Sequence, residues 1–134
     1  MIFVDSSVLL DLVTNDPVWK TWSLDTLSWA AAQDRLAIND PAYAELSVKF
    51  EHMDLLDEMI AELELLHPQI PKGALFMAGK AQLGYRRGGG SRTGVLPDFF
   101  IGAHAVYENA PLITRDPGRV RAYFPALELI APDR

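Results

Sequence analysis

Four acidic side chains are spaced along this 134-residue chain so that they could share one site. They are Asp5, Glu45, Asp98 and Asp116. Carboxylates that converge on one cleft repel each other, and hard divalent cations such as Mg²⁺ prefer oxygen ligands of this kind. A pair of such ions, about 3.5–4 Å apart, can stabilise the attacking and leaving oxygens of a phosphodiester. The chemistry to expect from these residues is therefore hydrolysis by a metal-bound water.

The segments beside these acids predict where they lie. Asp5 directly follows the apolar run 2–4, and Asp116 comes two residues after the run 112–114. In an open parallel α/β sheet, ligands bind at the carboxyl ends of the strands, so both acids are expected at that edge. Asp98 falls in the first turn of a predicted helix and is expected there too. Glu45 is expected one to two turns down an adjacent helix.

Each acid also has an ordinary structural role open to it. Asp5, between a strand and a helix, could be an N-cap, and Asp98 could complement a helix dipole. Asp116 could be a turn residue, and Glu45 could lie on a solvated surface. The functional interpretation depends on the recurrence of these acids at one topological place.

Periodicity predicts the elements that must position the four acids. Short apolar runs predict strands at 2–4, 36–38, 112–114 and 127–130. Helical spacing predicts helices at 8–13, 18–34, 40–50, 53–66, 73–85 and 97–109, with a connection at 67–71 that could hold a short strand and a glycine loop at 88–91. Strands alternating with helices predict one α/β domain over residues 1–134, with a central parallel sheet of four to five strands covered on both faces.

Composition narrows the class of protein. Hydrophobic residues make up 49% of the chain and charged residues 22%, which is typical of a folded domain. The absence of cysteine excludes a disulfide scaffold and a thiolate zinc site. No apolar run approaches the roughly 20 residues of a membrane helix, and the N-terminus has no signal-peptide pattern, so a cytoplasmic protein without membrane contact is expected.

Charge is divided unevenly along the chain. The net charge is −6, but residues 1–67 hold 13 acids and 3 bases, whereas residues 68–134 hold 5 acids and 9 bases. The C-terminal half could therefore face phosphate while the N-terminal half stays acidic. Ordinary surface charge is the alternative.

Four segments resemble one known family in order and spacing. They are IFVDSSVLL (2–10), NDPAYAEL (39–46), LPDFFIGAHA (96–105) and LITRDP (112–117). Together they resemble the PIN-domain ribonucleases, specifically toxins of the VapC type, over essentially the whole chain. One departure is the pair Phe99 and Phe100, which stands where smaller aliphatic residues are common and could change packing or place an aromatic ring near the substrate.

The resemblance implies a three-layer α/β/α fold and an endoribonuclease that depends on Mg²⁺ or Mn²⁺. It implies catalytic roles for the four acids, with Asp5, Asp98 and Asp116 as metal ligands, and hydroxyl support from Ser6 and Thr114. It also implies a cognate antitoxin that blocks the site, a homodimer, and a structured RNA substrate such as a tRNA or rRNA loop.

Two further groups of residues have two interpretations each. Arginines flank the glycine loop and surround Asp116, and they could bind RNA phosphates or be solvated surface residues. The arginines expected to bind RNA are Arg86, Arg87, Arg92 and Arg115, while Arg119 and Arg121 lie in the same region. Trp19, Trp22 and Trp29 would share one helical face, which favours a core stripe over a groove for an antitoxin helix.

Other functions remain as alternatives. A haloacid dehalogenase-type hydrolase would need a second Asp where Ser7 stands, and a receiver domain would need a late lysine, although no lysine follows Lys80. A non-catalytic α/β interaction module, with the acids as caps, is a third. A PIN-like nuclease of RNA processing outside a toxin–antitoxin system is a fourth, and a DNA-directed flap nuclease would need more residues than the chain has.

Overall fold

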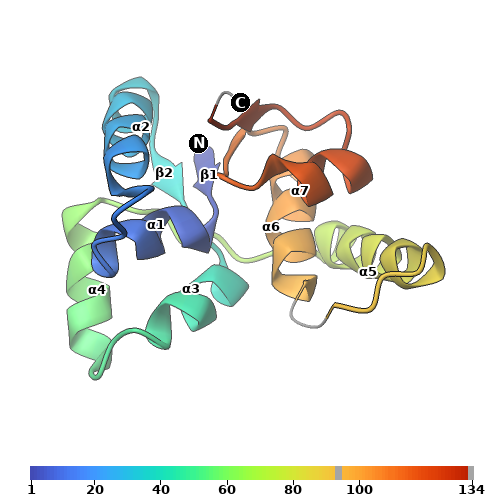
Figure 1. Cartoon of the computed structure of the whole chain (residues 1–134), viewed down its shortest axis with the longest axis horizontal. Helices are drawn as coiled ribbons and strands as arrows, with labels where there is room; N and C mark the ends of the chain where they lie inside the picture. Colours follow the sequence, from blue (N-terminus) through green and yellow to red (C-terminus); the bar gives the residue numbers. More distant parts are fainter. Residues whose placement is uncertain (93–94, 133–134) are drawn as a thin grey trace.

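The computed structural model describes residues 1–92 and 95–132 (Figure 1). Its strands are β1 (Ile2–Val4), β2 (Leu36–Ala37), β3 (Leu112–Ile113) and β4 (Leu129–Ile130). Its helices are α1 (Ser6–Val13), α2 (Lys20–Gln33), α3 (Asp40–Ser47), α4 (Met53–Glu62), α5 (Lys72–Arg87), α6 (Leu96–Tyr107) and α7 (Pro117–Tyr123).

The strands pair in parallel in the order β2-β1-β3-β4. Phe3 on β1 pairs with Ala37 on one side and with Leu112 on the other. All the strands therefore end at the same edge, and β1 and β3, which precede Asp5 and Asp116, are neighbours there. This arrangement confirms the predicted parallel sheet of four to five strands, since the described residues form four.

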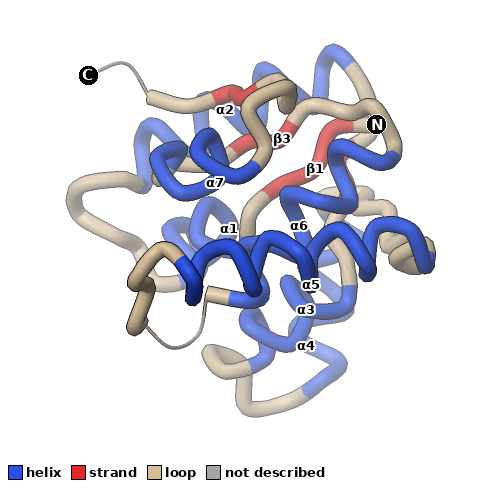
Figure 2. The backbone as a smooth tube through the Cα atoms, turned by 90° about the vertical axis from the view of Figure 1, so that its right-hand side faces the viewer, coloured by secondary structure: helices blue, strands red, loops and turns tan. Residues whose placement is uncertain are grey.

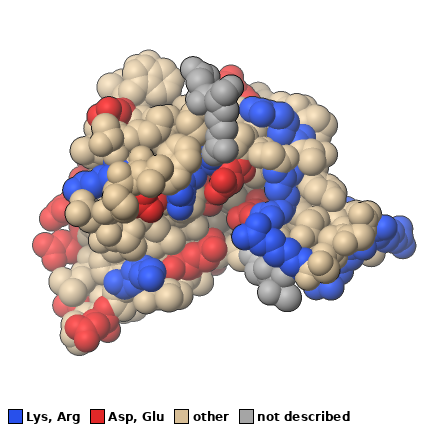
Figure 3. All heavy atoms as spheres, in the orientation of Figure 1, with Lys and Arg blue, Asp and Glu red and all other residues tan. Residues whose placement is uncertain are grey.

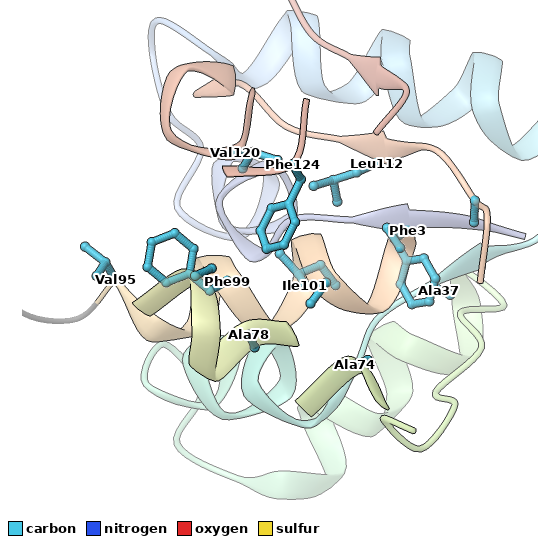
Figure 4. Packing of buried hydrophobic residues seen from close by; sticks show 14 residues of the cluster. Phe3, Ala37, Ala74, Ala78, Val95, Phe99, Ile101, Leu112, Val120 and Phe124 are labelled. Carbon is cyan, nitrogen blue, oxygen red and sulfur yellow. The ribbon is translucent and has the colours of Figure 1, made fainter. Parts of the chain in front are cut away.

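Alternate residues along the strands enter two separate cores. Phe3 and Leu112 pack with residues of α5, α6 and α7, and Figure 4 shows Phe99, Phe124 and Val120 in the same cluster. Val4 and Ile113 point to the opposite face, where they pack with α1, α2, α3 and α4. The short strands thus lie between two helical layers, which stand on the left and right of the sheet in Figure 1. Figure 2 looks onto the layer that contains α5 and α7. The three-layer α/β/α prediction is confirmed.

Proline and asparagine define the starts of the helices that carry the acids. The side chain of Asn39 caps α3 by accepting a hydrogen bond from the backbone N–H of Ala42 (3.4 Å). Proline stands within the first two positions of α3, α6 and α7, where its missing N–H costs no helical hydrogen bond. These starts place Glu45 and Asp98 at the same edge as the ends of β1 and β3.

Several predicted element boundaries were wrong. Helix α2 begins at Lys20 and not at residue 18, because the Asp16 carboxylate accepts the N–H groups of Val18 and Trp19 and holds a turn. Helix α4 ends at Glu62 and not at residue 66. Two residues after this end, Glu64 adopts a positive φ of 52°, which is not helical. The described residues 67–71 form no strand. Helix α7 was not predicted, because Pro117 followed by Gly118 is a pattern typical of a turn.

The predicted tryptophan core stripe was also wrong. Trp19 precedes α2, Trp22 is half-buried, and Trp29 is 55% exposed. The inward face of α2 is instead made by Ser23, Leu27 and Ala30. Within residues 1–92 and 95–132, no helix is both long and apolar enough to cross a membrane.

Candidate active site

The four acids line one cavity at the carboxyl edge of the sheet. This cavity has a volume of about 760 Å³ and lies between the two helical layers. Its charged lining consists of Asp5, Glu45, Asp98 and Asp116 together with Arg92, Arg119 and Arg121. Figure 3 shows acidic atoms in the hollow at the centre of one face, with basic atoms concentrated on the right-hand side. The four acids that the sequence placed near one edge of the sheet therefore do lie together in the structure.

Asp5 is the most buried of the four acids. It follows β1 and is 9% exposed, and its Oδ2 accepts a hydrogen bond from the Thr114 hydroxyl (3.0 Å). Burial and the nearby charge of Asp98 raise the pKa of Asp5 to about 6. An anion held here without a counter-charge is costly, so a bound cation would stabilise it.

The hydroxyl groups of Thr114 and Ser6 donate hydrogen bonds to two of the acids. Thr114 Oγ1 donates to Asp5 and also accepts the backbone N–H of Asp116 (3.2 Å), so it connects two acids. The hydroxyl of Ser6 donates to Glu45 Oε1 (2.9 Å), a partner on a different helix that the sequence did not identify. Glu45 is half-buried, and this burial raises its pKa. Asp116 is exposed and lies directly before α7.

Asp98 has a cationic partner inside the cavity. It lies in the first turn of α6, and its Oδ2 accepts a hydrogen bond from Arg119 Nη1. Burial raises the pKa of Asp98, while the charge of Arg119 opposes that rise. The sequence placed Arg119 near the site without linking it to Asp98, because the two residues belong to different helices.

The arginines expected to bind RNA fall into three groups. Arg92 lines the cavity, and Arg86 and Arg87 are exposed at the end of α5 outside it. Arg115 does not line the cavity, and its contact with RNA stays a prediction. It forms an ion pair with buried Asp11 (3.3 Å), because a carboxylate at that depth needs a counter-charge.

Two aromatic residues after Asp98 also have a defined place. Phe99 is fully buried and packs edge-to-face against Tyr123, with ring centroids 5.2 Å apart, and against Tyr85. Phe100 is partly buried against the same core. Of the two possibilities left open by the sequence, changed packing therefore applies to Phe99.

The oxygen donors of this cavity are of the kind that a hard divalent cation prefers. In the part of the chain that the structure describes, no three His, Asp or Glu side chains are grouped closely enough to hold a metal ion. Asp98 is instead paired with Arg119. Burial and the neighbouring carboxylates raise the pKa of Asp5, and the ligands in the cavity are oxygens, so the chemistry of these residues fits Mg²⁺ or Mn²⁺.

Comparison with known families assigns the fold. The family model described as the PIN domain matches residues 2–125. The chain belongs to the PIN domain family. In this PIN domain the family match spans all four acids and every described helix and strand except β4.

Solved structures of the same fold cover nearly the whole chain. VapBC2 from Rickettsia felis, bound to a promoter DNA fragment, is 20% identical, with a TM-score of 0.72, and the match covers 99% of this chain and 100% of that one. A toxin–antitoxin complex from Klebsiella pneumoniae is 19% identical, with a TM-score of 0.71 and coverage of 100% and 99%. VapBC-1 from nontypeable Haemophilus influenzae is 19% identical, with a TM-score of 0.67 and coverage of 98% of each chain. Among curated proteins, no relative was found.

Proposed function

We propose that this PIN domain is a divalent-metal-dependent endoribonuclease that acts as the toxin of a toxin–antitoxin pair. The observation that supports the nuclease is the convergence of four carboxylates and three arginines in one cavity. The acids provide oxygen ligands for Mg²⁺ or Mn²⁺, and the arginines provide charge for a phosphate backbone.

A bound metal would supply a polarised phosphate oxygen and a water of lowered pKa. The chain's own residues orient the reaction. Thr114 orients Asp5 and the backbone of Asp116 through two hydrogen bonds. Ser6 donates a hydrogen bond to one carboxylate oxygen of Glu45. The other Glu45 oxygen, Oε2, would accept a proton from the attacking water, and a raised pKa makes it a better base. Arg92 and Arg121 would bind the flanking phosphates.

The assignment as a toxin is supported by the complexes that share the fold, which include VapBC and toxin–antitoxin assemblies. We extend it to a cognate antitoxin that covers the cavity, a homodimer, a structured RNA substrate and a cytoplasmic site of action. A nuclease of RNA processing would have the same cavity without the antitoxin, and a non-catalytic interaction module would have no metal-dependent activity.

Cleavage of RNA in the presence of Mn²⁺ tests the nuclease. The wild-type chain should cleave, whereas Asp5→Asn and Asp98→Asn should lose at least about 100-fold in rate because each removes a metal ligand. Asp54→Asn is a matched control, since Asp54 is also an acid in the first turn of a helix but is exposed on α4 outside the cavity. Equal cleavage rates for the wild type and all three variants would contradict the assignment of this cavity as the active site.

Growth of a bacterial host tests the toxin. Induced expression of the wild-type chain should arrest growth, and Asp5→Asn should not. Normal growth with a wild-type chain that is active on RNA in vitro would favour the RNA-processing alternative.

A further inference from the structure

Arg119 is the one of the three cavity arginines that the proposed function does not assign to a flanking phosphate. It lies in the first turn of α7, and its side chain is 22% exposed. Its Nη1 donates to Asp98 Oδ2, and its guanidinium lies 5.8 Å from the ring centroid of Tyr85. Tyr85 in turn packs against Phe99 and Tyr123. An aromatic wall therefore holds the guanidinium beside one of the proposed metal ligands.

The charge of Arg119 acts on Asp98 and not on the whole cluster of acids. Arg119 is the strongest influence that lowers the pKa of Asp98, followed by Arg92. Asp5, by contrast, accepts a hydrogen bond from Thr114 and forms no ion pair within the described residues. Within that part of the chain, Asp98 has a cationic partner and its neighbour Asp5 has none.

We propose that Arg119 is an internal counter-ion that occupies the metal-binding side of Asp98 and must leave it when a divalent cation binds. The inference depends on the proposed function, because it takes Asp98 as a metal ligand. A guanidinium and a divalent cation at one carboxylate repel each other, so binding of the metal displaces the arginine. The displaced guanidinium remains inside a cavity where an RNA phosphate would bind, and its planar fork suits two phosphate oxygens.

Two opposite effects follow from removal of this arginine. Without Arg119, the metal no longer competes for Asp98, so the affinity for the metal rises. RNA, however, loses a phosphate contact, so its KM increases. A residue that only stabilised the fold would not produce opposite changes in these two quantities.

Titration calorimetry with Mn²⁺ tests the first effect. We expect Arg119→Gln to bind Mn²⁺ about 10-fold more tightly than wild type, which corresponds to about 1.4 kcal/mol. Arg121→Gln is the matched control, because Arg121 lines the same cavity but is not paired with Asp98, and it should change the affinity by no more than about twofold. Equal tightening in the two variants would show only long-range electrostatics and would overturn the proposal.

Arg119→Lys keeps the positive charge, so it tests the role of that charge even if Arg119→Gln folds poorly. Its Mn²⁺ affinity should stay within about threefold of wild type, since Lys and Arg carry the same charge. If Arg119→Lys tightens binding as much as Arg119→Gln does, the counter-ion role is wrong. In cleavage assays at saturating Mn²⁺, Arg119→Gln should raise the KM for RNA about 5–10-fold, a typical loss for one charged contact. An unchanged KM would contradict the proposal that the Arg119 guanidinium moves from Asp98 to an RNA phosphate.

Asp98→Asn separates failure of this inference from failure of the proposed function. If Asp98→Asn binds Mn²⁺ as tightly as wild type, or no variant binds Mn²⁺, the metal site itself is wrong and the inference falls with it. If Asp98→Asn weakens binding while the two glutamine variants behave alike, only the role of Arg119 is wrong.

Discussion

At the scale of single residues, one hydroxyl group links two of the four acids. Thr114 is fully buried, donates to Asp5 and accepts from the backbone of Asp116. Under the proposed function its contribution would be orientation, because a carboxylate that ligates a metal is held at the correct angle by a hydrogen-bond partner. Thr114 would then affect metal binding without contacting the ion.

Replacement of Thr114 by valine should weaken the binding of Mn²⁺ by about 10–100-fold, as is typical for loss of a hydrogen bond to a metal ligand. Valine keeps the shape and removes the hydroxyl, so the fold is retained. Thr114→Ser keeps the hydroxyl and should stay within about threefold of wild type. Titration calorimetry measures both, and equal affinities for Thr114→Val and wild type would contradict the role.

Asp5 makes the stability of the metal-free protein depend on pH. Its pKa is about 6 in the folded protein and near 3.8 when exposed to water. Between these values the folded state holds a proton that the unfolded state has released, so the contribution of Asp5 to stability falls as pH rises from about 4 to 6. Above that range the folded protein carries a buried, unneutralised charge.

Asp5→Asn should accordingly stabilise the metal-free protein at pH 7 by up to about 3 kcal/mol, and by almost nothing near pH 4. Urea unfolding in the presence of EDTA measures the difference. Addition of Mn²⁺ should stabilise the wild type and not the variant, since only the wild type binds the ion. A stabilisation that is the same at both pH values would argue against burial of this charge.

At the scale of elements, the segment that carries Asp116 is attached to the opposite helical layer. Arg115 follows β3, and it pairs with Asp11 on α1, whose carboxylate also accepts the hydroxyl of Ser23 on α2. The Arg115 guanidinium lies 5.5 Å from the ring centroid of Trp19. This group of contacts positions the turn between β3 and α7 relative to the helix that follows Asp5.

Removal of one partner from that ion pair should be more damaging than removal of both. Asp11→Asn should cost about 2–4 kcal/mol of unfolding free energy, because Arg115 loses its charged partner in a largely buried place. The double variant Asp11→Asn, Arg115→Met should lose less than the sum of the two single losses. Urea unfolding of the wild type, the two single variants and the double variant gives the coupling energy. Strictly additive losses would mean that the ion pair contributes no coupling energy to stability.

A second contact joins the layers behind the cavity. His104 on α6 is fully buried, and its Nδ1 accepts a hydrogen bond from Asn39 Nδ2 (3.3 Å). Burial lowers the pKa of His104, which keeps the imidazole neutral and able to accept. Asn39 also caps α3, so the helices that carry Asp98 and Glu45 are connected through one asparagine.

At the scale of the whole molecule, charge follows the two helical layers. Acidic atoms dominate the side of α1 to α4, and basic atoms dominate the side of α5 to α7 (Figure 3). The cavity lies where the two layers meet, so RNA would approach it over the basic layer. Arg86 and Arg87 are exposed at the end of α5, and under the proposed function they would add phosphate contacts outside the cavity.

The double variant Arg86→Gln, Arg87→Gln should weaken RNA binding and flatten its dependence on salt. Loss of two phosphate contacts with a single strand lowers the slope of log K against log salt by about 1.4. Lys49→Gln, an exposed lysine in the acidic half, should leave the slope unchanged. Fluorescence anisotropy over a salt series measures the slope, and a double variant that matches wild type would place the RNA elsewhere.

The sequence alone determined the parallel sheet, the two helical layers and the edge where the acids meet. It could do so because strand ends are local features, and parallel strands bring their carboxyl ends together regardless of side-chain detail. The tertiary structure decided the partners: Ser6 with Glu45, Arg119 with Asp98, and Arg115 with Asp11. Each pair joins separate elements, so its formation depends on how the layers pack. The four acids were thus predictable as a group, and the arginine that neutralises one of them was not.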